Sequence, residues 1–131
     1  MKRKYKIILP IIIIVLAVFI IAVKLVSDSQ KNLDQLAGAT IQNVDLKNIP
    51  NGVYRGECNV FPISVIVDVT VNNHKIIKID LIKHTNGKGT PAEILTSKVV
   101  EAQSLNIDTV SGATYSSKAI LKAIENALLK K

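Results

Sequence analysis

The sequence predicts an α+β fold, in which an N-terminal transmembrane helix is followed by a small antiparallel sheet of three or more strands packed against two helices. Three observations lead to this expectation. Residues 7–26 form an almost unbroken apolar run, residues 63–71 alternate strictly between apolar and polar or outward positions, and helical patterns occupy residues 90–103 and 116–129. Because each short element has one apolar face to cover, two helices on one face of the sheet form the expected layers.

The apolar run has the length of a membrane span. Its 20 residues are interrupted only by Pro10 and Lys24, and at about 1.5 Å per residue they cover a hydrocarbon core of about 30 Å. Four bases precede the run and no acid lies within residues 1–26, which favours a cytoplasmic N-terminus and a domain on the extracytoplasmic side of the cell membrane. A cleaved signal peptide is the alternative, but its apolar core is usually shorter and ends at a small-x-small site.

The charge distribution separates the anchor from the rest of the chain. The net charge is +7, but five of the 17 bases lie in residues 1–26, and the remaining 105 residues carry 12 bases and 10 acids, a net +2. With 4% aromatic residues, this part lacks the basic and aromatic surface of a nucleic-acid-binding protein. We therefore expect four parts. They are a basic cytoplasmic N-terminus (residues 1–6), a single-pass transmembrane helix (residues 7–26), a stalk or linker (residues 27–51) and a folded domain (residues 52–131).

A meander of three strands follows the stalk. Residues 53–60 form the first strand and residues 63–71 the second, with Asn72, Asn73 and His74 as the turn, since Asn tolerates positive φ. Residues 75–83 return as the third strand. We expect one face of that strand to carry Ile77, Ile79 and Leu81.

Local signals mark the start of both later helices. Thr90 and Glu93 match a capping box with Pro91 at the first helical position. In the last helix, Ser116 or Ser117 is the expected N-cap. The two histidines, at residues 74 and 84, are interpreted as solvated loop side chains.

The segment 108–117 (DTVSGATYSS) offers a place for an anion. Four small residues run directly into the last helix, so the backbone is open to close approach. A helix N-terminus with free N–H groups favours a phosphate, and Lys118 adds positive charge in the first turn. On physical grounds alone, an ordinary helix cap after a loop explains the segment equally well.

The string DTVSGATYSSKAILKAIENAL, together with the opening GVYRGE and the strand pair around VNNHKIIKIDL, resembles the FMN-binding domain family. That family includes the C subunit of the sodium-translocating NADH:quinone reductase and its Rnf-type relatives, and the likeness extends over residues 52–129. It implies FMN as cofactor, joined through a phosphoester to the Thr of SGAT, which is Thr114 here. A separate flavin transferase takes the FMN from FAD. The residues that match its recognition pattern are Asp108, Ser111, Gly112 and Ala113.

The resemblance also implies an electron carrier. Separately, the sequence shows no catalytic acid–base pair, which favours a carrier over a stand-alone enzyme. Tyr115 and residues 84–90 are expected to line the flavin ring, while Ser116, Ser117 and Lys118 lie where the phosphate would be held. The partners implied are the membrane, the flavin transferase and a redox partner protein or quinone. Non-covalent FMN binding and a flavin-free structural or sensory ectodomain remain alternatives.

A second GAT segment lies in the predicted stalk. Asp34 and Thr40 repeat the Asp-to-Thr spacing of the first segment, but Ala37 replaces the Ser and no amphipathic helix with Ser caps follows. We therefore expect Thr114, and not Thr40, to carry the flavin.

Overall fold

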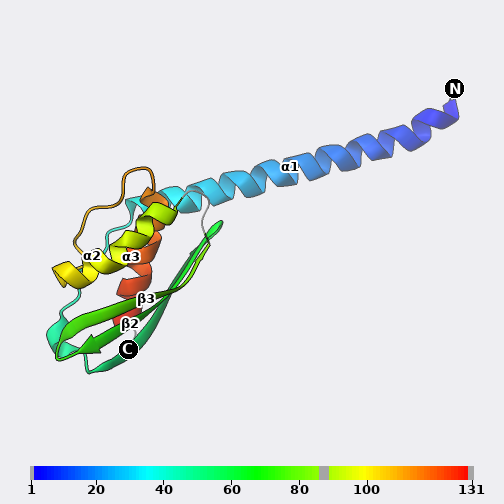
Figure 1. Cartoon of the computed structure of the whole chain (residues 1–131). Coiled ribbons are helices and arrows are strands. Elements are labelled where there is room, and N and C mark those ends of the chain that lie inside the picture. Colours follow the sequence, from blue (N-terminus) through cyan, green and yellow to red (C-terminus); the bar gives the residue numbers. More distant parts are fainter. Residues whose placement is uncertain (1, 86–88, 130–131) are drawn as a thin grey trace. The chain divides into compact units, whose positions relative to one another are not determined.

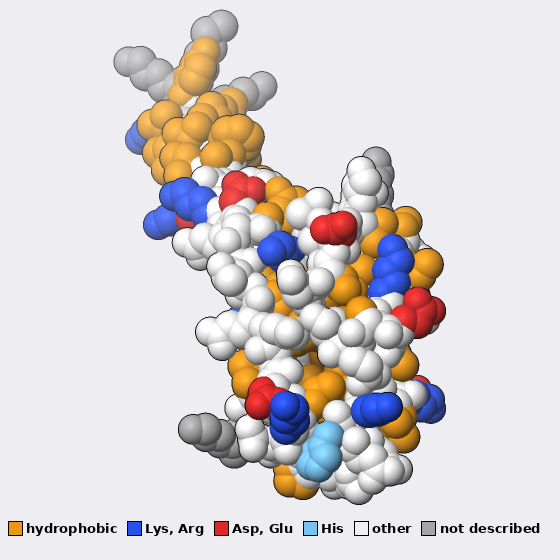
Figure 2. Space-filling model, turned by 90° about the vertical axis from the view of Figure 1, so that its left-hand side faces the viewer, with side chains coloured by type: hydrophobic (Ala, Val, Ile, Leu, Met, Phe, Trp, Pro, Cys, Tyr) orange, Lys and Arg blue, Asp and Glu red, His pale blue; other side chains and the backbone are white. Residues whose placement is uncertain are grey.

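The computed structural model describes residues 2–85 and 89–129 and divides the chain into two compact units, residues 1–31 and 32–131. Helix α1 (Lys2–Gly38) begins in the first unit and ends in the second. Its portion Tyr5–Gly38 is long and apolar enough to cross a membrane. The large apolar side chains at residues 7–26 are 46–70% exposed, and Figure 2 shows the continuous apolar surface that they form. This surface indicates membrane anchoring.

The second unit contains the expected sheet. Strands β1 (Gly52–Val60), β2 (Ile63–Asn72) and β3 (Lys75–Thr85) pair antiparallel in the order β1-β2-β3. The alternation in β2 is confirmed, because its five apolar residues at odd positions from 63 to 71 are at most 6% exposed. The turn from β2 to β3 places Asn73 and His74 at φ 49° and 60°, as a type I′ hairpin requires.

Two β-bulges in β3 change which of its residues face inward. The pairing skips Ile77 between the pairs Thr70–Lys78 and Val71–Ile76, and it skips Ile82 between Ile66–Lys83 and Val67–Leu81. A bulge adds a residue to one strand and reverses the phase of the side chains that follow. The prediction that Ile77 lies on the buried face is therefore wrong: Ile77 is 53% exposed, and Ile76 is buried in its place.

The remaining helices cover one face of the sheet (Figure 1), α3 (Thr114–Leu129) against β1 and β2, and α2 (Leu95–Ala102) against β3. The 3-10 helix η2 (Thr90–Ile94) precedes α2. The expected capping box is not formed, because Gly89 is the N-cap residue of η2 and has no side-chain cap. The α+β class is confirmed, with the helices and the anchor in the order that the sequence predicts.

Residues 32–51, which the sequence indicates as stalk, lie in the second compact unit and contribute to its core. Leu33, Leu36 and Ile49 are each at most 8% exposed. Helix η1 (Leu46–Asn48) begins with a cap, the Asp45 side chain accepting from the Lys47 N–H. These scattered apolar residues show no period in the sequence, so only the packed structure reveals that they complete the core.

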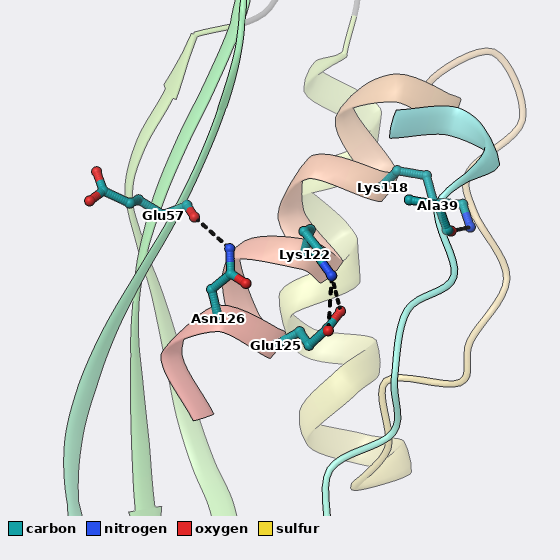
Figure 3. Close-up of polar contacts among 6 residues, drawn as sticks. All are labelled: Ala39, Glu57, Lys118, Lys122, Glu125 and Asn126. Atoms are coloured by element: carbon teal, nitrogen blue, oxygen red, sulfur yellow. Dashed lines mark hydrogen bonds and ion pairs between the residues drawn. The ribbon is translucent and has the colours of Figure 1, made fainter. Parts of the chain in front are cut away.

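Helix α3 lies unusually close to β1 at Gly56. A Cβ atom built there would lie 2.5 Å from the backbone nitrogen of Ala127 and would also overlap the carbonyl oxygen of Ala123. Nearby, the Asn126 side chain donates to the Glu57 carbonyl at 2.9 Å, as Figure 3 shows. Contact of helix and strand backbones thus fixes the position of α3 on the sheet and, with it, the position of its N-terminus.

Candidate functional site

The segment before α3 is a tight turn that presents the start of the helix. The Ala113 N–H donates to the Val110 carbonyl at 3.0 Å, and Gly112 has φ 79°. This φ is the requirement for the third residue of a type II turn, which glycine satisfies without strain. Open space surrounds the position of a Cβ at Gly112, so a ligand can approach the backbone there.

Two hydrogen bonds of the Ser117 side chain connect this turn to α3. Its Oγ donates to the Ala113 carbonyl at 2.7 Å and accepts from the Val110 N–H at 3.0 Å. The side chain is completely buried. The prediction that Ser116 or Ser117 caps α3 is therefore wrong: the helix begins two residues earlier, at Thr114, and the two serines lie inside its first turn.

The earlier start places Thr114 at the N-terminal end of a 16-residue helix, where it is exposed. The first N–H groups of a helix have no acceptor within it, and the helix dipole adds positive potential at the same end. A phosphate on the Thr114 hydroxyl would meet both.

A hollow of about 220 Å³ opens beside Thr114. One wall is apolar, from Leu33, Pro62 and Ile63, and the rest is formed by Gly89 and by Gly112, Ala113, Thr114, Tyr115 and Ser116. Ligand pockets usually measure roughly 300–1,000 Å³, so this hollow holds part of a large planar ligand and leaves the remainder at the surface.

His84 has a buried, bridging position that the sequence interpretation missed, although residues 84–90 were expected to line the flavin ring. It was expected to be a solvated loop residue, but its side chain is only 2% exposed. Its Nδ1 lies 2.8 Å from Oε1 of Glu93 and its Nε2 lies 3.0 Å from Oγ of Ser116. The second bulge of β3 turns His84 inward opposite Val65, and no sequence pattern reveals a bulge. His74 is exposed, as expected.

The other candidate residues differ in their relation to the hollow. The Lys118 ammonium donates to the Ala39 carbonyl at 2.8 Å (Figure 3), and Lys118 is not among the residues that line the hollow. The Tyr115 hydroxyl donates to Asp34 at 3.0 Å, although its ring lines the hollow. Asp108 and Ser111 are exposed on the loop that leads to α3, where another protein could read them.

The second GAT segment, residues 38–40, also lies beside α3, near Lys118. Thr40 borders a separate hollow of about 320 Å³, together with Lys118 and Thr109. It follows the end of α1 and is not the first residue of a helix, unlike Thr114. Residues 86–88, part of the loop expected to line the flavin ring, lie outside the described residues. Within the described ranges, no cluster of three or more His, Cys, Asp or Glu side chains could hold a metal.

This small α+β domain has an exposed hydroxyl at a helix N-terminus and an apolar hollow beside it. These features suit the binding of a phosphorylated planar cofactor. The chain belongs to the FMN-binding domain family, whose model matches residues 61–129, and FMN is its cofactor. The residues present fit that group, because Gly112 leaves room at the turn, the start of α3 suits the phosphate, and the hollow offers an apolar surface to a ring.

The chain is also similar to part of a much longer protein, the NADH:acrylate oxidoreductase of Vibrio harveyi. The two are 37% identical over 95 residues, which cover 67% of this chain and 9% of the relative. The shared part is therefore about the size of one domain of that protein.

Proposed function

We propose that this protein is a membrane-anchored electron carrier whose FMN is attached covalently to Thr114. The observation that carries the proposal is the position of Thr114, exposed at the first residue of α3 and bordering an apolar hollow. The proposal places the N-terminus in the cytoplasm and the domain on the extracytoplasmic side, on the strength of the bases that precede the apolar run. There, a covalent bond would keep a soluble cofactor from being lost.

Attachment requires a flavin transferase and FAD as the donor. The Thr114 Oγ1 attacks the phosphorus of the FMN half of FAD and forms a new O–P bond. The bond from that phosphorus to the bridging oxygen breaks, AMP leaves with the bridging oxygen, and the hydroxyl proton passes to the transferase or to water. No electrons are exchanged. The exposed residues Asp108 and Ser111 lie where the transferase can contact them.

The first turn of α3 suits the product of this reaction. A phosphodiester keeps one negative charge, which a helix N-terminus stabilises by roughly 0.3–1 kcal/mol. The Lys118 ammonium donates to the Ala39 carbonyl at 2.8 Å, so in this arrangement the helix N-terminus, rather than Lys118, faces the phosphate.

When bound, FMN accepts electrons and passes them on, and the protein supplies attachment, orientation and surroundings. The shallow hollow leaves part of the flavin accessible, which suits exchange with a redox partner protein or a quinone. The longer Vibrio protein, named an NADH:acrylate oxidoreductase, contains a similar segment in 9% of its length. We infer that the similar segment of this chain is a carrier module, while the activity in that name belongs to the whole relative.

The test is the intact mass of the full chain, purified from membranes after co-expression with a flavin transferase. We expect the wild type to gain the mass of FMN less one water, and Thr114→Val to gain nothing. Thr40→Val is the matched control and should be labelled like the wild type. Added mass that survives Thr114→Val would refute the site, and a wild type with FMN bound but no added mass would favour the non-covalent alternative.

A further inference from the structure

A histidine buried between a carboxylate and a hydroxyl contacts the first turn of the helix that begins with the proposed attachment site. The His84 side chain is 2% exposed and bridges Glu93 in η2 and Ser116 in α3, at 2.8 and 3.0 Å. It comes from the end of β3. One imidazole thus joins three separate elements at the point where α3 begins.

The direction of each hydrogen bond depends on which ring nitrogens of His84 carry a proton. An ionised carboxylate only accepts hydrogen bonds, so next to an ionised Glu93 the Nδ1 of His84 is the donor. Nε2 then accepts from the Ser116 hydroxyl when the ring is neutral and donates to it when the ring is protonated. The Ser116 side chain is held in one orientation, and the same residue borders the hollow beside Thr114.

The order hydroxyl, imidazole, carboxylate is also that of a hydrolase triad. A nucleophile must reach its substrate, however, and Ser116 is 3% exposed. It also lies in the first turn of α3 rather than on a sharp strand-to-helix turn. The hydroxyl of Thr114, two residues earlier, is exposed by contrast.

We propose that His84 is a positioning residue for modification of Thr114. Through Ser116 it holds the first turn of α3 in the orientation that presents the Thr114 hydroxyl to the flavin transferase. This inference rests on the proposed covalent attachment. It deepens that proposal by assigning a role to a buried side chain that is not among the residues lining the hollow.

The test measures transfer kinetics on the apoprotein. Full-length wild type, His84→Ala, His84→Gln and Ser116→Ala are each incubated with FAD and a purified transferase, and the rate of labelling is followed by intact mass. Thermal unfolding reports the folded fraction of each variant. His74→Ala is the matched control, because His74 is the other histidine of the chain and is exposed in a turn.

Misplacing a reacting group by about 1 Å can cost roughly 100-fold in rate. We therefore expect His84→Ala and Ser116→Ala to lower kcat by roughly 10- to 100-fold, with KM for the domain changed less than about threefold. His84→Gln, which keeps a hydrogen-bonding group, should recover part of kcat, and His74→Ala should match the wild type. Because Ala is a good helix former, Ser116→Ala keeps the test valid if His84→Ala does not fold.

Three results overturn the inference. Folded Ser116→Ala and His84 variants labelled at the wild-type kcat would show that the bridge does not position Thr114. A raised KM with an unchanged kcat would make His84 part of the transferase-binding surface instead. A wild type that gains no flavin mass would overturn the covalent attachment itself and this inference with it, which distinguishes that failure from the other two.

Discussion

Replacing Gly56 by Ala tests whether the close contact of β1 and α3 sets the position of the helix that carries Thr114. The added Cβ would lie 2.5 Å from the Ala127 nitrogen and 2.7 Å from the Ala127 Cβ, and would overlap the Ala123 carbonyl oxygen. Two of these three atoms belong to the backbone, so no side-chain rotation relieves the overlap. Helix α3 must move away from β1, or the strand must distort.

Overpacking of a core usually costs about 1–3 kcal/mol, and backbone obstruction places Gly56→Ala at the upper end, about 3 kcal/mol. For a domain of up to about 100 residues, 1 kcal/mol lowers Tm by roughly 4–8 °C. We therefore expect Tm to fall by roughly 12–24 °C in thermal unfolding of the detergent-solubilised full chain, followed by circular dichroism. Flavin attachment at Thr114 should fall as well, because the N-terminus of α3 moves with the helix.

Gly52→Ala is the matched control, since it makes the same change in the same strand. The nearest atoms to its new Cβ belong to the Tyr54 ring at 3.7 Å, an ordinary contact. Its effect should stay within about 0.5 kcal/mol. If Gly56→Ala unfolded within a few degrees of Gly52→Ala, the close packing of α3 on β1 would not constrain the helix, and the argument for its role would be wrong.

Two further changes test the turn and the surface of the sheet. Ser117→Ala leaves the half-buried Val110 N–H without its acceptor and should lower the stability of the fold by about 1–3 kcal/mol, measured by chemical denaturation. A loss under about 0.5 kcal/mol would show that the turn does not depend on this hydroxyl. On the outer face, the Arg55 guanidinium, 2.7 Å away, lowers the pKa of the Asp68 carboxyl below its usual value of 3.8 by hydrogen bonding and charge. Asp68→Asn should therefore reduce stability at neutral pH, and the difference from the wild type should disappear as the pH falls through that lowered pKa, which unfolding curves from neutral pH to about pH 2 would check. A difference that persisted unchanged in acid would contradict the ion pair as its cause.

Periodic patterns predicted the parts of the fold in which every residue obeys the same rule. Strand β2 alternates from Ile63 to Val71, and each apolar residue at an odd position is buried because no bulge interrupts β2 itself. The candidate acceptor Thr114 was likewise found from a contiguous string. Prediction failed where a single residue changes the phase, as at Ile77, or where a polar group finds a distant partner.

The His84 bridge illustrates that second limit. Its partners Glu93 and Ser116 lie 9 and 32 positions further along the chain, and the sequence near each residue has a simpler interpretation. Glu93 matched a capping box and Ser116 matched a helix cap, because both residue types favour those positions. The folded chain uses both for one imidazole instead, an arrangement that local propensity does not encode.

Each of the two bulges of β3 changes which residues of the strand, even-numbered or odd-numbered, face the core. The residue at Ile77 moves the inward positions from even to odd numbers, and the residue at Ile82 restores the even frame just before His84. Regular pairing continued from Asn72 and Lys75 would place Ile82 opposite Val65, so it is the two extra residues that bring His84 to that position. The register of β3 is therefore more constrained than the composition of its outer face, because the register decides which side chain reaches the start of α3.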